Sequence, residues 1–169
     1  MVRVRQSAAA VKGAHHEAAG LSDWCPSCTL PNEMSNPRRI GLISCSKAKL
    51  GTVALARDLY SRSDLFRKAT EYCSQHLDGW YVLSAKHGLV APDQVLEPYD
   101  LTLKQLSAGQ RRAWGKDVAG SLRDLGDVEL EAHAGSVYVR ALVDAGVELS
   151  NPLRGLSIGR RKRWYLDHS

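Results

Sequence analysis

Residues 80–100 read WYVLSAKHGLVAPDQVLEPYD, and this stretch combines a strand pattern with a dense group of polar side chains. Its first residues, Trp80 to Leu83, form a continuous apolar run that favours strands, which predicts a buried central strand. The run breaks into the polar segment Ser84 to Gly88, where a strand would leave its sheet. A second polar cluster, Glu97 to Asp100, closes the following loop. Hydroxyl, amine, imidazole, carboxylate and phenol groups thus occur close together, and we expect a pocket here.

Strand and helix patterns alternate along the rest of the chain from residue 38. Apolar or alternating patterns indicate three more strands, at 39–46, 128–132 and 147–149. Apolar residues at helical spacing indicate helices over 63–77, 107–125, 137–145 and 155–166, the first of them capped by Ser63. Such alternation predicts an α/β fold, a three-layer α/β/α sandwich with a mostly parallel central sheet.

Each predicted strand ends in polar residues. In an open parallel sheet, ligands bind outside the carboxyl ends of the strands, so these residues are expected to converge on one site. Any single polar ending could be a capping turn, but four together favour a binding site. With Tyr99 from the loop after the second strand, the expected substrate-binding residues are Ser44, Cys45, Ser46, Lys47, Ser84, Lys86, Gly88, Tyr99, His133, Gly135 and Asn151.

The first strand ending offers hydroxyls, a thiol and an amine. Ser46 and Lys47 are expected to hold a phosphate, although the spacing of a Walker loop is absent. Cys45 is either a small packed hydrophobe or a nucleophile with a histidine base. At the third ending, the helix that starts beside His133 and Gly135 offers an anion site, or Gly135 simply permits close packing.

The catalytic candidates are His87, Glu97 and Asp100. His87 is suited to acid–base chemistry near neutral pH, or it caps a loop. The two carboxylates could orient water or stabilise a sugar cation, as paired carboxylates do in glycoside chemistry. Capping of the next helix explains Asp100 equally well, but it does not explain Glu97. Tyr99 between them is expected to stack on a base.

Composition sets the broad class of the protein. The chain has 169 residues, of which 44% are hydrophobic and 24% charged, as in one soluble domain with a real core. No apolar run is long enough to span a bilayer, and the N-terminus lacks the apolar centre of a secretion signal, so we expect a cytoplasmic protein with no membrane partner. The net charge of +5 permits an anionic partner such as a nucleotide or nucleic acid.

Residues 1–37 differ from the rest, being rich in Ala, Ser, His and Gly without sustained periodicity. We expect a flexible tail, followed by a single domain over 38–169. The pair Cys25 and Cys28 lacks a second pair that would complete a zinc site, so no metal site is predicted. The sequence shows no cofactor motif either, and it leaves the oligomeric state open.

The C-terminal segment carries the run Arg160, Arg161, Lys162 and Arg163, with Trp164 and Tyr165 beside it. A basic run with neighbouring aromatic residues could contact the phosphate backbone of a nucleic acid. The alternative is a solvated helix face, which is common for charge runs near a terminus.

Two segments carry a family resemblance. Residues 83–92 and 97–101 resemble the part of the YaaA peroxide-stress proteins that reads L-S-G-x-Y-G-L-L-x-P with P-Y after it. Residues 44–49 look like the P-C-S-x-x-K element in the accessory domain of archaeosine synthase. The whole of 39–165 looks like a small bacterial and phage family of unassigned function that carries both elements.

The resemblance implies a uracil-DNA glycosylase-like fold and a role in nucleic-acid or nucleobase metabolism. We therefore expect a domain that binds a nucleobase, nucleoside, nucleotide or nucleic acid and that possesses, if it is an enzyme, N-glycosidase or base-transferase activity. In that reaction His87 would assist the leaving base. The alternatives are a non-catalytic DNA- or RNA-binding module using the C-terminal basic run, and a protein-interaction domain.

Overall fold

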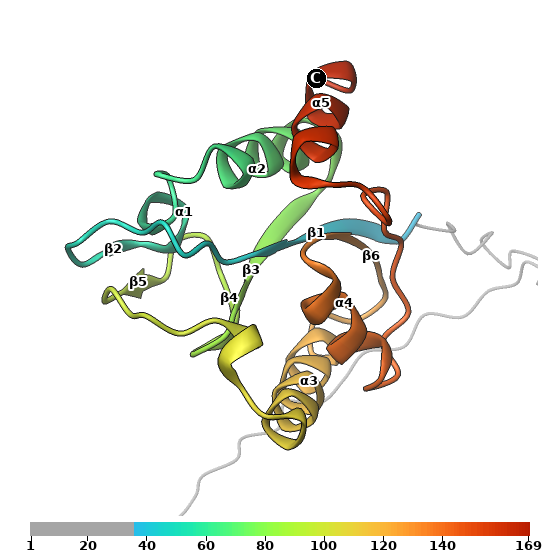
Figure 1. Ribbon diagram of the computed structural model, residues 1–169. Helices are drawn as coiled ribbons and strands as arrows, with labels where there is room; N and C mark the ends of the chain where they lie inside the picture. Colours follow the sequence, from blue (N-terminus) through green and yellow to red (C-terminus); the bar gives the residue numbers. More distant parts are fainter. Residues whose placement is uncertain (1–35) are drawn as a thin grey trace, which may run out of the picture. The chain divides into compact units, whose positions relative to one another are not determined.

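The computed structural model describes residues 36–169, and a four-stranded sheet lies at their centre (Figure 1). The strands are β1 (Arg38–Ser44), β3 (Gly79–Ser84), β4 (Gly88–Val90) and β6 (Val128–His133). They are ordered β4-β3-β1-β6, with β3 and β6 parallel to β1 and β4 antiparallel to β3. The predicted central strand is therefore internal, and its last residues Val82, Leu83 and Ser84 are buried.

Helices cover both faces of the sheet (Figure 1). On one side α2 (Asp64–His76) and α5 (Ile158–Asp167) pack over a hydrophobic cluster that includes Ile43. On the other side α3 (Ala108–Arg123) and α4 (Ser136–Val143) pack over a cluster that includes Leu42. Neighbouring residues of β1 thus point to opposite faces, as the pleat requires. The prediction of a mixed α/β domain with a mostly parallel sheet is confirmed.

Short elements lie beside the carboxyl ends of β1 and β3. A two-residue ladder joins β2 (Ala54–Leu55) to β5 (Val95–Leu96), and α1 (Ala56–Leu59) follows directly after β2. The 3₁₀ helix η1 (Leu103–Gln105) connects this region to α3. These elements hold the loops after β1 and after β4 against the end of the sheet.

Helix starts follow the capping pattern of the sequence. The Ser63 hydroxyl accepts from the N–H of Phe66 at 3.3 Å and begins α2. The Ser107 hydroxyl accepts from the N–H of Gln110 at 3.3 Å, while the Gln110 side chain accepts from the N–H of Ser107 at 2.8 Å. Each cap satisfies N–H groups that a helix start leaves unpaired.

The expected strand at 147–149 is wrong. Only an isolated parallel bridge joins Ser150 to Glu131, with the N–H of Ser150 donating to the carbonyl of Leu130 at 2.8 Å. The segment therefore touches the edge of β6 without extending a ladder. None of the helices in residues 36–169 is long and apolar enough to cross a membrane. The predicted tail over 1–37 and the pair Cys25 and Cys28 fall almost wholly outside the described residues.

Candidate functional site

The ends of β1 and β3 bring two of the predicted segments together. Ser44 lies opposite Leu83 in the parallel register, and the N–H of Cys45 donates to the carbonyl of Leu83 at 3.0 Å. The polar segment after β1 is thereby held beside Ser84. Two stretches far apart in the sequence thus form one surface at the carboxyl end of the sheet.

Three hydroxyl groups form a chain at this surface. The Tyr99 hydroxyl lies 2.8 Å from that of Ser84 and 2.7 Å from that of Tyr60. The Ser84 oxygen also accepts from the N–H groups of Lys86, at 3.3 Å, and His87, at 3.0 Å. Since both lone pairs of Ser84 are occupied, its proton is directed to Tyr99, which in turn donates to Tyr60.

The phenols at this end of the sheet stay protonated at neutral pH. Burial raises the pKa of Tyr60 to about 12, and burial with the nearby Cys45 raises the pKa of Tyr99 well above its usual value. Burial with Cys45 raises the pKa of Tyr138 in the same direction. Each phenol therefore acts as a hydrogen-bond donor.

Lys49 lies against this chain of hydroxyls. Its Nζ is 4.3 Å from the ring centre of Tyr99 and 5.8 Å from that of Tyr60, which is within cation–π distance. The nitrogen is buried and has no hydrogen-bond partner among the described residues. Burial lowers the pKa of Lys49, while the charges of Cys45 and Asp100 act in the opposite direction. The arrangement leaves three amine donors open to an acceptor.

Cys45 connects the site to α4. Its Sγ lies 3.2 Å from the hydroxyl of Tyr138, and that hydroxyl also accepts from the N–H of Leu103 at 3.4 Å. On the other side of the site, the Trp114 indole donates to the carbonyl of Ser84 at 2.8 Å. Residues from α3 and α4 therefore fix both polar strand ends.

A cavity of about 100 Å³ lies beside Cys45. Phe66 forms an apolar part of the wall, and the His133 residue at the end of β6 closes it. The polar groups along it are supplied by Ser44, Cys45, Ser46 and Ser63. The cavity offers hydroxyl and thiol groups close to an apolar wall.

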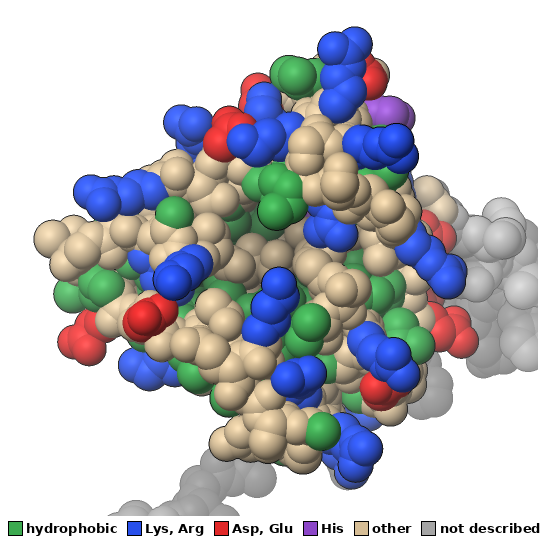
Figure 2. Space-filling model, viewed as in Figure 1, with side chains coloured by type: hydrophobic (Ala, Val, Ile, Leu, Met, Phe, Trp, Pro, Cys, Tyr) green, Lys and Arg blue, Asp and Glu red, His purple; other side chains and the backbone are tan. Residues whose placement is uncertain are grey.

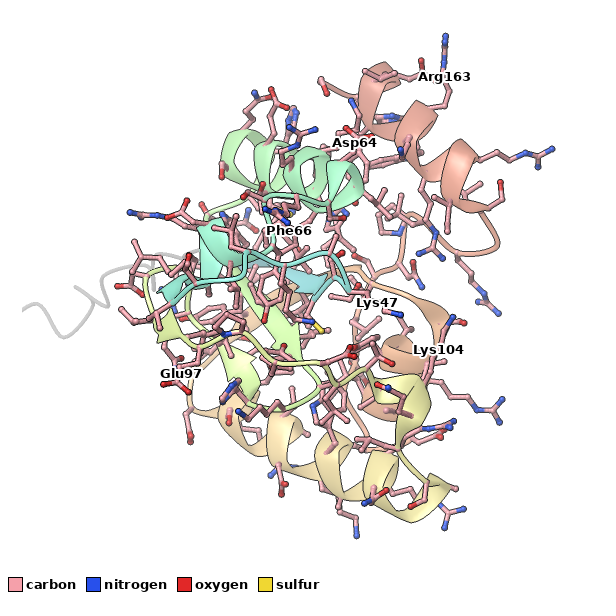
Figure 3. All side chains as sticks on the ribbon, turned by 60° about the vertical axis from the view of Figure 1, so that its left-hand side comes forward. Lys47, Asp64, Phe66, Glu97, Lys104 and Arg163 are labelled. Carbon is pink, nitrogen blue, oxygen red and sulfur yellow. The ribbon has the colours of Figure 1, made fainter. Side chains whose placement is uncertain are left out.

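The three catalytic candidates lie at different places. His87 is exposed, and its ring meets the Tyr99 ring edge-on at 5.4 Å between centres. Burial, and then the charge of Lys86, lower the pKa of His87, which favours neutral imidazole. Asp100 is exposed near Lys49. Glu97 follows β5 at the outer edge of the molecule, across the view from Lys47 and Lys104 (Figure 3).

Tyr99 contacts neighbours through both its hydroxyl and its ring, and its expected stacking on a base stays a prediction. Its hydroxyl is paired twice, and Lys49 and His87 lie against its ring. Lys86 adds a third neighbour, with Nζ 5.8 Å from the ring centre. Tyr99 therefore connects Ser84, Tyr60 and Lys49 within the site.

The other predicted binding residues lie near the strand ends in varied surroundings. The Ser46 hydroxyl accepts from the N–H of Ala48 at 3.2 Å, and Lys47 is exposed beside it. Gly88 begins β4 with a φ of 72°, a conformation that glycine adopts readily. Gly135 is the N-cap of α4.

His133 belongs to a buried network. Its Nδ1 is 2.9 Å from the hydroxyl of Tyr165, and its Nε2 is 3.0 Å from the carboxylate of Glu131. Glu131 also pairs with Arg39 at 3.1 Å. Both ring nitrogens are thus occupied by the fold, so His133 holds α5 to β6. Asn151, at the fourth predicted ending, has a buried Oδ1 without a partner among the described residues.

The C-terminal basic run is largely engaged within the fold. Lys162 pairs with Asp64 of α2 at 2.8 Å, and Arg163 pairs with Asp167 at 2.9 Å. Arg161 donates to the carbonyls of Leu156, at 3.0 Å, and Ala134, at 3.2 Å. Arg160 alone has no such bond in residues 36–169. Figure 3 shows Arg163 far from Lys47 and Glu97.

Four residues of the site were not among the predicted site residues. Lys49 closes the polar segment after β1, so its position in that segment was a usable signal. Tyr60 and Tyr138 are aromatic residues at core spacing, and Trp114 sits on the apolar face of a helix. Nothing in the pattern of these three separates a packed ring from a ring that donates a hydrogen bond into a site.

The described residues hold no group of three or more His, Cys, Asp or Glu side chains placed to bind a metal ion. In comparisons with known proteins, residues 40–167 match the model described as a family of unknown function, DUF6884. No curated protein and no solved structure matches the chain. The resemblance to YaaA and to the archaeosine synthase accessory domain therefore stays a prediction.

Proposed function

We propose that this chain, which belongs to the DUF6884 family, binds a nucleotide at the carboxyl ends of β1 and β3. The observation that carries the proposal is the buried Nζ of Lys49, which has no hydrogen-bond partner in residues 36–169. Buried polar groups are nearly always paired, and an unpaired buried amine is costly. An anionic group of the ligand, such as a phosphate, supplies the missing acceptor with a charge-assisted bond.

The cavity beside Cys45 supports a nucleobase as the uncharged part of the ligand. Its hydroxyl and thiol groups offer donors and acceptors to a polar ring edge, and Phe66 offers an apolar wall. Small-molecule sites combine apolar walls with a few placed polar groups in this way. The volume of about 100 Å³ suits a single small ring.

Fold and charge favour the same class of ligand. The sequence resemblance implies a uracil-DNA glycosylase-like fold, and ligands of open parallel sheets bind at the strand ends, so both favour a nucleotide at this place. The net charge of +5 favours an anionic partner. The resemblance to YaaA and to the archaeosine synthase accessory domain supports a setting in nucleic-acid or nucleobase metabolism.

N-glycosidic chemistry is the second candidate, and the proximity of Asp100 to Lys49 favours it. A carboxylate beside the ligand can stabilise cation character on a sugar as the base departs. Neutral His87 lies next to Tyr99 and could exchange a proton with the base. Glu97, at the outer edge, takes no part in this version of the mechanism.

A thermal-shift screen of the full chain tests the proposal. A ligand that binds only the folded state raises the melting temperature, so nucleotides should raise it more than the matching nucleosides or free bases. Equal shifts by nucleosides and nucleotides would contradict the role of Lys49. Free base detected by mass spectrometry, and lost in Asp100→Asn, would support the second candidate. If a nucleotide binds but stays intact, the second candidate fails and only the binding function remains.

A further inference from the structure

A groove runs along α4, apart from the Lys49 site. It consists of two adjoining hollows of about 460 and 500 Å³ that share Ser136, Arg140 and Asp144. The first hollow lies between α3 and α4, and the second lies between α4 and the segment 149–161. We call these two hollows together the α4 groove.

The α4 groove is strongly basic. Its lining residues include five arginines, and Asp144 is the one acidic residue among them. Asp144 approaches only Arg140, at 3.8 Å between exposed side chains, so it offsets little of the charge. Figure 2 shows Lys and Arg side chains gathered over this face of the molecule. The arginines come from three separate parts of the chain and are Arg111, Arg112, Arg140, Arg154 and Arg161.

Two of these arginines are presented by the same short motif. The pattern Leu-Ser-x-Gly-x-Arg occurs at 106–111, where α3 begins, and again at 156–161, where α5 begins. In both copies the serine is the N-cap and the arginine Nε donates to the carbonyl of the leucine, at 2.9 Å for Arg111 and 3.0 Å for Arg161. One copy lines each hollow, so the motif supplies a matched cation on both sides of α4.

The bonds that hold these arginines leave their charge unneutralised. Arg111 also donates to the carbonyl of Lys104, and Arg161 donates to that of Ala134. No carboxylate lies within ion-pair distance of either guanidinium in the part of the chain that the structure describes. A guanidinium that is already held in place loses less freedom when it binds an anion. The groove is therefore organised before any ligand arrives.

Apolar side chains lie between the charges. Val137 and Ala141 line the first hollow, and Val139, Val143 and Leu149 line the second. Val143 is 54% exposed. A single nucleic-acid strand matches this pattern because its phosphates meet the arginines while its unpaired bases reach apolar surface and guanidinium planes. The bases of a duplex are paired and turned inward, so they gain nothing from the apolar lining.

We infer that the α4 groove binds the phosphate backbone of a single-stranded nucleic acid. The inference rests on the proposed nucleotide site, since it makes the nucleotide held at Lys49 one residue of a longer strand. Tyr138 ties the two places together: it belongs to α4, and its hydroxyl contacts Cys45 of the site at 3.2 Å. The groove also replaces the C-terminal basic run as the expected nucleic-acid contact, with Arg161 as the residue they share.

The test measures binding of a labelled oligothymidylate of about 12 nucleotides to the full chain by fluorescence anisotropy. The groove variant is Arg112→Gln, Arg140→Gln and Arg154→Gln combined, which leaves the two motif arginines and their structural bonds intact. The control variant combines Arg57→Gln, Arg62→Gln and Arg67→Gln, which removes the same charge from residues that do not line the groove. Binding is followed from about 50 to 200 mM salt.

The groove variant should bind the oligonucleotide roughly tenfold more weakly at low salt, and its salt slope should fall by about 2, since each phosphate contact to a single strand contributes about 0.7. The control variant should match the wild type. An equal loss in the control, tighter binding of the matching duplex, or tighter binding of polyglutamate would overturn the inference.

A mononucleotide separates this inference from the proposed site. The groove variant should keep the thermal shift given by a mononucleotide, while Lys49→Met should lose it. If the mononucleotide shifts the wild type but the groove variant binds the oligonucleotide normally, the groove inference fails and the Lys49 site stands. If no mononucleotide binds while the groove variant loses the oligonucleotide, the groove stands without the proposed site.

Discussion

The Nζ of Lys49 lies 4.3 Å from the centre of the Tyr99 ring, and the hydroxyl of the same tyrosine is paired with Ser84 and Tyr60. The Lys49 amine thus lies against the ring of Tyr99, whose hydroxyl already has two hydrogen-bond partners. The ring contact partly compensates the burial of the amine but provides no hydrogen-bond acceptor. The fold therefore holds the amine in place and leaves its donors open.

Removing the Tyr99 hydroxyl should destabilise the domain. In Tyr99→Phe the Ser84 hydroxyl loses its acceptor and the Tyr60 hydroxyl loses its donor, which should lower the free energy of unfolding by about 1–3 kcal/mol. Tyr81→Phe is the matched control, because the half-buried Tyr81 makes no side-chain hydrogen bond among the described residues. Denaturant unfolding measures both variants. Equal stability of the two would show that the hydroxyl chain contributes nothing.

The contact between α3 and α4 depends on Gly115. A Cβ at this position would overlap the carbonyl oxygen of Ala141 in α4. Gly115→Ala should therefore lower the free energy of unfolding by about 1–3 kcal/mol, even though alanine favours helices. Gly120→Ala lies in the same helix with open space around the new Cβ, and it should raise stability by up to about 1 kcal/mol. Thermal melts that rank the two variants the other way would contradict this packing.

The Glu131 network should make stability depend on acid pH. The hydrogen bond from His133 is the largest cause of the lowered pKa of Glu131, and Arg39 acts in the same direction. A carboxylate with a lowered folded-state pKa contributes stability above its unfolded pKa, near 4.5, and loses it as the pH falls through the folded value. Glu131→Gln should cost about 1–3 kcal/mol at neutral pH. The difference in free energy of unfolding between Glu131→Gln and the wild type should disappear at acid pH. A difference that persists there would show that the charge of Glu131 is not its cause.

Lys49 should also make stability rise with pH, in the alkaline range, because the burial of its charge is a cost that deprotonation removes. Burial lowers the pKa of Lys49 below its unfolded value of 10.5. Between the folded and the unfolded pKa, the unfolded state therefore binds more protons than the folded state, and stability rises with pH. The cost of burying the charged amine is present below the folded pKa and is relieved above it. Lys49→Met should be at least as stable as the wild type at neutral pH. As the pH rises towards about 10, the free energy of unfolding of the wild type should increase relative to that of Lys49→Met. Denaturant unfolding at several pH values measures this difference.

The sequence predicted the architecture well where local pattern and tertiary environment agree. The apolar run from Trp80 to Leu83 became an internal strand, and Ser63 and Ser107 begin helices as their capping patterns indicate. The strand expected at 147–149 failed because this three-residue segment at the sheet edge leads to a single bridge at Ser150 and forms no ladder. The spacing of apolar residues in the sequence does not show whether a partner strand lies close enough to pair.

The site was predicted in part. Cys45, Ser84, Tyr99 and Asp100 do gather at the ends of β1 and β3 with Lys49. His133 lies at a strand end as expected, yet it turns into a network with Tyr165 and Glu131. The direction of a side chain at a strand end depends on which helix packs over it. The local sequence does not show which helix that is.

Binding of a nucleotide to Lys49→Met, compared with wild type and with Lys116→Met, tests the central claim most directly. Lys116 is exposed on α3, is not among the predicted binding residues, and provides the same loss of charge. Isothermal titration of the best nucleotide from the screen should show at least roughly tenfold weaker binding to Lys49→Met, since a charge-assisted bond is worth about 1.5–3 kcal/mol. Lys116→Met should stay within about threefold of the wild type. Equal binding by Lys49→Met and wild type would contradict the account.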